Sequence, residues 1–313
     1  MKKYKVYVAP MAGITNQSFR LICKEFGADM VYSEMISDMG IIKKNKKTVD
    51  MLEFDKKERP IAIQLFGNKP SEMLEAAKYV EKHFHPDFID INCGCPAKKV
   101  ADSKKAGSAL MKSPKLIFEI TKALVDNLKT PVSVKIRSGW SKNSINALEV
   151  AKLVQDAGAS LITIHPRTKE QEFSGLSDWN LIKEVKGLLK IKVVGNGDIK
   201  TCYDAKKMFE QTNCDAIMLG RSIIGNPWLI KECKDYLEKG IEPKQISIKE
   251  RVDVLIKHVK LLKEEYNEKQ AALLIRPHLS KYFFGIKNRK TYIVDMMKLN
   301  SGSEIIKYLK TID

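Results

Sequence analysis

Eight short hydrophobic runs rich in valine and isoleucine recur between residues 4 and 221. They lie at 4–10, 29–35, 60–67, 87–93, 131–137, 160–166, 191–197 and 215–221. Each run is nearly continuous rather than alternating, which is typical of parallel strands that are covered on both faces. Between the runs, apolar residues recur at helical spacing, most clearly over 71–84 and 146–158. The pattern therefore predicts eight strand–helix units.

Eight such units in succession predict an α/β protein with a (β/α)₈ TIM barrel. An open, doubly wound sheet is the alternative, but even spacing without an evident reversal of strand order favours closure. The pattern changes near residue 240, where 237–250 has the composition of a linker and only helical periodicity follows. We expect a barrel over residues 1–240 and a small all-helical domain over residues 241–313.

The charge of the chain points to a polyanionic partner. The sequence has 55 basic and 38 acidic residues, a formal net charge of +17. Phosphate contacts release counterions and steer association, so such an excess favours nucleic acid binding. A general lysine bias of the source genome would give the same excess, and composition alone leaves both explanations open.

The cysteines and the apolar segments indicate a cytoplasmic protein without a membrane partner. The six cysteines, at positions 23, 93, 95, 202, 214 and 233, are scattered and do not form a disulfide framework. The start of the chain is basic, but Pro10 interrupts its short apolar run, which favours a first strand over a signal peptide. No segment approaches the roughly 18 apolar residues needed to span a bilayer.

In a TIM barrel, functional groups gather where the strands end. Two of these ends are rich in glycine: 193–198 (VVGNGD) and 218–228 (MLGRSIIGNPW), the second leading into a helix. Glycine lets backbone amides approach an anion, and a helix N-terminus supplies oriented donors. The two ends together predict a phosphate site that includes Arg221, although ordinary turn glycines are the alternative. A dinucleotide fingerprint is excluded because its third glycine is missing.

Other strand ends carry polar side chains that need a partner. Lys135 and Arg137 alternate along one strand and therefore point to the same face. Gln64 lies inside an apolar run, and His165 ends another strand. Buried charges and amides are costly unless something polar meets them. A flat heterocycle with several carbonyls and nitrogens would satisfy Lys135, Gln64 and His165 together, whereas a lone histidine is commonly structural.

Cys93 and Cys95 are separated by one residue, which limits their joint chemistry. A zinc site would need further cysteine or histidine pairs at set spacings, and the sequence has none. A disulfide across a single residue would be strained. We expect Cys93 to be a small buried residue, and Cys95, between Gly94 and Pro96, to lie on a loop over the barrel mouth. No metal is expected.

Several segments together resemble the signature segments of the tRNA-dihydrouridine synthases, with the bacterial B-type branch as the nearest match. They are 9–20 (APMAGITNQSFR), 63–67 (IQLFG), 90–111 (DINCGCPAKKVADSKKAGSALM), 134–137 (VKIR), 164–168 (IHPRT), 195–198 (GNGD) and 219–228 (LGRSIIGNPW). The most specific part is Asn-x-Gly-Cys-Pro followed by two lysines. Residues 275–285 (IRPHLSKYFFG) resemble the helical domain of that family less tightly.

The resemblance implies an FMN-containing barrel that reduces the 5,6 double bond of uridines in the tRNA D-loop, with NADPH as electron source. We also expect a monomer. Cys95 would be the proton donor. The flavin ring would be lined by Pro10, Met11 and Ala12 and bonded at its polar edge by Gln64, Lys135 and His165. The ribityl phosphate would be held by Asn196, Gly197, Asp198, Gly220 and Arg221. The RNA would be bound by Asn92, Arg137, Lys98 and Lys99.

Two other functions are compatible with parts of the pattern. A flavin barrel acting on a free pyrimidine, similar to dihydroorotate dehydrogenases, would share the strand-end residues, but the basic charge and the helical appendage argue against it. An RNA-binding protein built on an inactive barrel would share the charge. The first would reduce free uridine efficiently, and the second would take up no FMN.

Overall fold

The computed structural model describes residues 4–312, and its centre is a sheet of eight parallel strands. The strands are β1 (Val6–Val8), β2 (Val31–Ser37), β3 (Ile61–Phe66), β4 (Phe88–Cys93), β5 (Val132–Arg137), β6 (Leu161–His165), β7 (Lys192–Asn196) and β8 (Ala216–Leu219). All eight predicted strands are confirmed. Their ends differ from the prediction by at most two residues, and β2 continues to Ser37 through a register shift between Tyr32 and Met35.

The order of the strands closes the sheet into a barrel. Their order is β1-β8-β7-β6-β5-β4-β3-β2, so neighbours in sequence are neighbours in space, and β1 also pairs with β8. The remaining edges meet through a parallel bridge between Tyr7 and Met30, where the Val8 N–H donates to the Met30 carbonyl over 3.0 Å. The predicted TIM barrel is confirmed, and the open doubly wound sheet is excluded.

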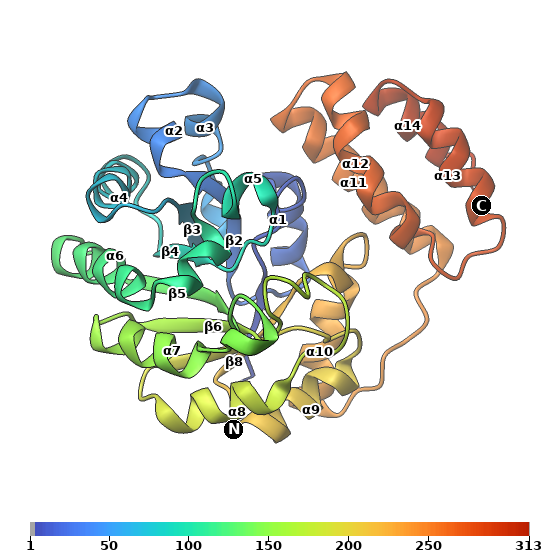
Figure 1. The fold of residues 1–313 in the computed structure, drawn as a ribbon. Coiled ribbons are helices and arrows are strands. Elements are labelled where there is room, and N and C mark those ends of the chain that lie inside the picture. The colour runs from blue at the N-terminus through green and yellow to red at the C-terminus, as the bar shows by residue number, and fades with distance from the viewer. Residues whose placement is uncertain (1–3, 313) are drawn as a thin grey trace.

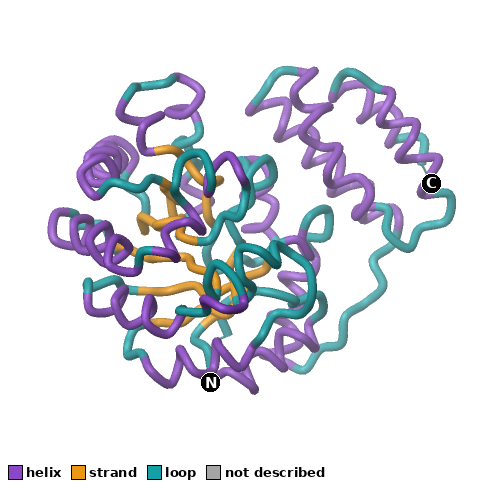
Figure 2. The backbone as a smooth tube through the Cα atoms, viewed as in Figure 1, coloured by secondary structure: helices purple, strands orange, loops and turns teal. Residues whose placement is uncertain are grey.

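Helices surround the barrel, as Figure 1 shows. The longer ones are α1 (Gln17–Glu25), α4 (Pro70–Phe84), α6 (Pro114–Asn127), α7 (Ala147–Asp156), α8 (Trp179–Leu188), α9 (Cys202–Thr212) and α10 (Trp228–Lys239). Shorter ones are α2 (Asp38–Ile42), α3 (Lys46–Asp50) and α5 (Lys98–Ala101), with 3₁₀ turns at 56–58, 107–112, 142–144 and 221–223. Figure 2 shows the same arrangement, with strands inside and helices outside.

The two faces of each strand contribute to different hydrophobic layers. Val193 packs in the layer between strands and helices, whereas the next residue, Val194, belongs to the cluster inside the barrel. Because successive strand residues point to opposite faces, every second residue points inward. Coverage of both faces explains why the strands are continuous hydrophobic runs in the sequence. It also directs the polar strand residues predicted from sequence into the barrel.

Four further helices follow the barrel: α11 (Ile248–Glu265), α12 (Glu268–Tyr282), α13 (Arg289–Lys298) and α14 (Gly302–Leu309). They share a hydrophobic cluster that is separate from the barrel core and also includes Trp228 of α10, with Leu255, Ile275 and Met296 among its other members. The linker expected at 237–250 is shorter in the structure, because α10 continues to Lys239 and α11 begins at Ile248. Within residues 4–312, no helix is both long and apolar enough to cross a membrane.

The C-terminal helices contact the barrel directly. The Glu265 carboxylate, at the end of α11, accepts hydrogen bonds from the backbone N–H groups of Gln17 (3.2 Å) and Ser18 (2.8 Å) at the start of α1. A carboxylate at a helix N-terminus is stabilised by the helix dipole. Helix α12 lies against Gly225, which has a φ of +59° and where a Cβ would collide with the His278 carbonyl oxygen. These contacts hold the end of α12 beside the barrel.

Candidate active site

A cavity of about 830 Å³ opens at the C-terminal ends of the strands. This volume is within the range of small-molecule and cofactor sites. The residues predicted from sequence that line it are Pro10, Met11, Ala12, Gln64, Asn92, Cys95, Lys135, Arg137, His165, Asn196, Gly197, Asp198, Gly220 and Arg221. Lys98 and Lys99 are outside this wall and lie exposed at the start of α5. The structure therefore brings together every predicted site residue except those two lysines.

A chain of hydrogen bonds runs from the barrel interior to the Cys95 loop. The fully buried Asp90 carboxylate accepts from Ser133 Oγ over 2.6 Å and from Gln64 Nε2 over 2.7 Å. Gln64 Oε1 accepts from Asn92 Nδ2 over 2.7 Å. Asn92 Oδ1 in turn accepts from the backbone N–H of Gly94 (3.0 Å) and of Cys95 (2.9 Å). Asn92 therefore holds the loop that carries the thiol.

The Cys95 thiol differs from the other cysteines in its exposure and surroundings. Cys95 is half-buried, whereas the other five cysteines are buried, and all six are free. Burial raises the pKa of Cys95, while the Ala97 N–H and the charges of Arg137 and Lys135 oppose this increase. The group is therefore protonated at neutral pH. Cys93 lies in the core, as predicted.

Lys135, which is half-buried, and His165, which is buried, lie in the same cavity but differ in charge. Burial lowers the pKa of Lys135 to about 8, with a further decrease from Arg137, and its Nζ donates to Asn196 Oδ1 over 3.1 Å. Burial and four nearby cationic side chains lower the pKa of His165 well below its usual value, so the imidazole is neutral. Its Nε2 lies 3.3 Å from Arg167 Nη1. A guanidinium only donates, so Nε2 accepts and the ring proton is on Nδ1.

Arg137 connects two loops around the cavity, the one after β4 and the one after β6. It is buried, and its Nε donates to the Gly94 carbonyl over 2.7 Å while its Nη1 donates to the carbonyls of Thr168 and Glu172, each over 2.8 Å. Its guanidinium carbon also lies 5.6 Å from the centre of the half-exposed Phe173 ring. Arg137 therefore positions the Cys95 loop as well as contributing positive charge.

Arg167 pairs with Asp198 and was not assigned a role from the sequence. Its Nη2 donates to both carboxylate oxygens of Asp198, over 2.8 and 2.7 Å, and its Nη1 donates to Ser177 Oγ over 2.9 Å. Burial alone would raise the pKa of Asp198, but these hydrogen bonds, with one from the Ser177 N–H, hold it below its usual value. With its carboxylate engaged in this way, Asp198 can offer an anion only its backbone N–H.

The loops after β7 and β8 form a concave site with donors for an anion. Gly197 has a φ of +119°, and a Cβ there would collide with Ser177 Oγ and crowd His165 Cδ2, so only glycine fits. Arg221 follows Gly220 on the other loop and lies 4.3 Å from the Phe173 ring centre. Ser222 Oγ is buried on the cavity wall, and no group within residues 4–312 forms a hydrogen bond with it. An anionic ligand would satisfy this hydroxyl.

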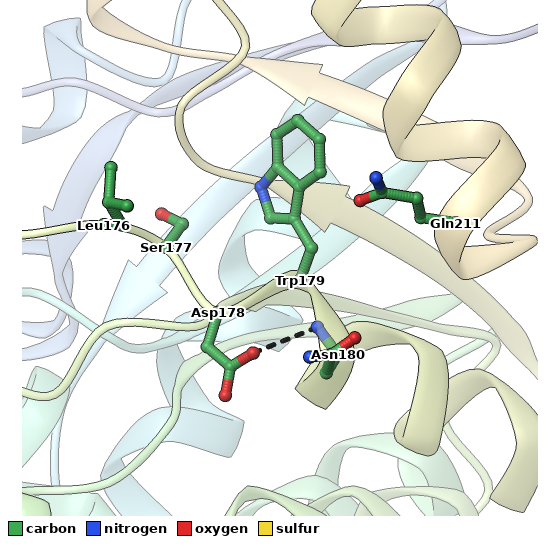
Figure 3. Close-up of a pocket in the computed structure, with 6 residues that line it drawn as sticks. All are labelled: Leu176, Ser177, Asp178, Trp179, Asn180 and Gln211. Carbon is green, nitrogen blue, oxygen red and sulfur yellow. Dashed lines mark hydrogen bonds between the residues drawn. The ribbon is translucent and has the colours of Figure 1, made fainter.

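A second, more open hollow lies at the β6–α8 loop, and residues that line it form hydrogen bonds that support the wall of the first cavity. It measures about 370 Å³ and is lined by Leu176, Ser177, Asp178, Trp179, Asn180 and Gln211 (Figure 3). Trp179 Nε1 donates to the Gly197 carbonyl over 3.0 Å, and Asp178 caps α8 by accepting from the Asn180 N–H over 3.1 Å. These polar groups hold the loops in place. Among residues 4–312, no three His, Cys, Asp or Glu side chains are placed to hold a metal ion.

Comparison with known proteins identifies the family. The family model described as "Dihydrouridine synthase (Dus)" matches residues 7–311. The chain belongs to the dihydrouridine synthase family. Members of this family are flavin-dependent oxidoreductases. A "Probable tRNA-dihydrouridine synthase" from Aquifex aeolicus is 39% identical over 299 residues, which cover 94% of this chain and 92% of that relative.

The B-type resemblance is confirmed by further members of the dihydrouridine synthase family. A "tRNA-dihydrouridine synthase B" from Pasteurella multocida is 38% identical over 91% of this chain and 85% of its own length. Among solved structures, an old yellow enzyme homologue from Zymomonas mobilis has a TM-score of 0.52 at 15% identity, covering 78% of this chain and 91% of that one. Histamine dehydrogenase from Rhizobium sp. 4-9 has the same TM-score at 17% identity, and the match covers 82% of this chain and 49% of that one. These two structures show the shared fold.

Several residues of the cavity and its hydrogen-bond network were not predicted from the sequence to belong to this site, among them Asp90, Arg167, Ser222 and Lys281. Two of these residues could have been found from the sequence. Asp90 is a charge inside an apolar strand, two residues before Asn92, and Arg167 follows His165 by two residues at a strand end. Ser222 had no such signal, and Lys281 stands out in the sequence only as one of the basic residues of the helical domain. Only the folded chain brings Lys281 from α12 to the wall of the barrel cavity.

Proposed function

We propose that this chain is a tRNA-dihydrouridine synthase that uses FMN and NADPH to reduce specific D-loop uridines, with Cys95 as the proton donor. The observation that carries the proposal is the position of a protonated, half-buried thiol on the wall of a cationic cavity in a family fold. We also propose that residues 1–240 form the FMN-binding barrel and that residues 241–313 form a tRNA-binding helical domain. The protein would act as a cytoplasmic monomer.

The residues of the cavity fit FMN. Its volume suits a tricyclic ring with a ribityl chain. The unpartnered Ser222 hydroxyl, Arg221 and the Gly197 backbone suit the phosphate, while Lys135, Gln64 and the neutral His165 suit a ring edge with carbonyls and nitrogens. Pro10, Met11 and Ala12 would line the ring. Lys135 would offset negative charge on the ring in a largely dry site, where electrostatic interactions are strong.

FMN, when bound, supplies the hydride that is added to carbon 6 of uracil. Cys95 then donates its proton to carbon 5, so that the S–H bond breaks as a C–H bond forms. The resulting thiolate is stabilised by the Ala97 N–H and by the charges of Arg137 and Lys135. Solvent returns the proton to sulfur. A protonated thiol can act as the acid of this step without first acquiring a proton.

Asn92 and Arg137 would bind the uracil edge, and their internal hydrogen bonds limit how. Asn92 Oδ1 already accepts two backbone N–H groups, and one Nδ2 hydrogen is donated to Gln64 Oε1, so the second Nδ2 hydrogen, on the side of Met35 Sδ, is the one that a uracil carbonyl would accept. Because Arg137 Nε and Nη1 bind loop carbonyls, its Nη2 is the nitrogen best suited to the substrate. A uracil reaches such a cavity only after leaving its stack, and Lys98 and Lys99 would then contact the RNA backbone.

The test compares substrates with the purified, flavin-loaded chain. With NADPH, uridines in tRNA lacking dihydrouridine should become heavier by two hydrogens, as measured by nucleoside mass analysis, while free uridine should react far more slowly. Efficient reduction of free uridine would instead favour a small-molecule flavin enzyme. A colourless preparation that takes up no FMN would favour an RNA-binding protein on an inactive barrel. Substituting NADH for NADPH tests the choice of electron donor.

A further inference from the structure

The turn between α12 and α13 exposes an aromatic ring between two cations. Phe284 is 63% exposed. The Lys281 Nζ lies 5.9 Å and the Arg289 guanidinium carbon 5.6 Å from the centre of its ring. A single exposed hydrophobic side chain is ordinary on a protein surface. Phe284 has two cations within about 6 Å of its ring, as Phe173 does, and each is attracted by the ring face.

Phe284 lies close to the mouth of the barrel cavity. Lys281 is part of the cavity wall, together with Ser222 and Ile224 of the barrel. The Phe284 N–H donates to the Lys281 carbonyl over 3.1 Å, so the ring follows Lys281 by less than one helical turn. The close packing of α12 on Gly225 holds this end of the helix against the barrel. The backbone that carries the ring is therefore held beside the cavity, although the exposed Phe284 side chain itself packs in no hydrophobic cluster of residues 4–312.

The surrounding charge selects for a polyanion. Between Glu268 and Asp295 the chain contains no acidic residue and six basic ones: Lys269, Arg276, Lys281, Lys287, Arg289 and Lys290. A second copy of this chain docking symmetrically on Phe284 would bring two such segments together, and like charges across an interface oppose association. An RNA offers both a flat base to stack on the ring and phosphates for the cations.

We propose that Phe284 is a stacking platform for an unpaired base next to the target uridine, with Lys281 and Arg289 binding the flanking phosphates. This inference rests on the proposed function, since it specifies how the RNA is held while one uridine occupies the cavity. Stacking on an aromatic side chain tolerates any base and is used by proteins that bind unpaired RNA. Phe284 would hold the neighbouring nucleotide out of the helical stack.

The experiment measures tRNA affinity of the full-length, flavin-loaded chain at several salt concentrations. Phe284→Ala should weaken binding about 5- to 100-fold, the range of one base stacked on an aromatic ring, without changing the slope of affinity against salt. Phe284→Tyr should bind as the wild type does. Lys281→Ala or Arg289→Ala should instead reduce the salt slope by nearly one. The matched control is Leu273→Ala, an aliphatic residue on α12 that is 46% exposed, and it should leave binding unchanged.

Three results would overturn the inference. If Phe284→Ala binds tRNA as tightly as the wild type, and the wild type reduces tRNA, Phe284 has no stacking role but the proposed function stands. If Phe284→Ala changes only the sedimentation coefficient of the protein and leaves its tRNA affinity unaffected, the ring contacts a second copy of the chain. Failure of the wild type to bind tRNA at all would overturn both the inference and the proposed function.

Discussion

Replacing Asp90 by asparagine should stabilise the protein at alkaline pH. Asp90 is fully buried, and burial raises its pKa from 3.8 to about 6 despite hydrogen bonds from Ser133 and Gln64 and the charge of Lys135. A shift of one pKa unit corresponds to about 1.4 kcal/mol, so ionising this carboxyl in the folded state costs about 3 kcal/mol. The attraction between Asp90 and Lys135 is already contained in that pKa.

The sign of the effect follows from the direction of the shift. The folded-state pKa lies above the unfolded one, so the stability contributed by Asp90 is fully present below about pH 4 and is lost as pH rises through about 6. Asparagine keeps an oxygen acceptor for Gln64 and never ionises. The free energy of unfolding of Asp90→Asn should therefore exceed that of the wild type by up to about 3 kcal/mol at about pH 8.

Urea denaturation followed by circular dichroism at about pH 4 and about pH 8 measures this difference. The difference in unfolding free energy between Asp90→Asn and the wild type should disappear at the lower pH, where the wild-type carboxyl is protonated. The control is Asp253→Asn, at an exposed position on α11, which should change stability by less than about 0.5 kcal/mol. If Asp90→Asn is no more stable than the wild type at alkaline pH, ionising the buried carboxyl does not cost the free energy of folding inferred here.

Three other substitutions test separate parts of the structure. Cys95→Ala should keep the flavin spectrum and NADPH oxidation by oxygen but lose about 10²–10⁴-fold in uracil reduction, and undiminished reduction would exclude Cys95 as the acid. Glu265→Ala, which removes the carboxylate that binds the first two N–H groups of α1, should lower the free energy of unfolding by about 0.5–2 kcal/mol, whereas the exposed neighbour Glu264→Ala should not. Burial lowers the pKa of His278 to about 3, so its stabilising contribution is present above about pH 6.5 and declines as pH falls. Relative to the wild type, His278→Gln should therefore gain about 1.4 kcal/mol per pH unit below that point in urea denaturation, and a constant difference would refute this.

The sequence by itself determined the barrel and many of the polar side chains on the cavity wall. Parallel strands covered on both faces must be hydrophobic throughout, so their runs are visible in one dimension, and the alternation of side chains places Lys135 and Arg137 on one face. Because all strands of a TIM barrel end at the same rim, residues at separate strand ends, such as Asn92 and Asn196, could be assigned to one site.

Only the tertiary structure decided how those residues are used. The path from Asp90 through Gln64 to the Cys95 loop, and the pairing of Arg167 with Asp198 across 31 positions, depend on strand register and side-chain rotamers that no local pattern specifies. The same holds for Lys281, which reaches the cavity because α12 packs on Gly225. Periodicity encodes which face a residue occupies, whereas its partners are chosen by packing between segments distant in the chain.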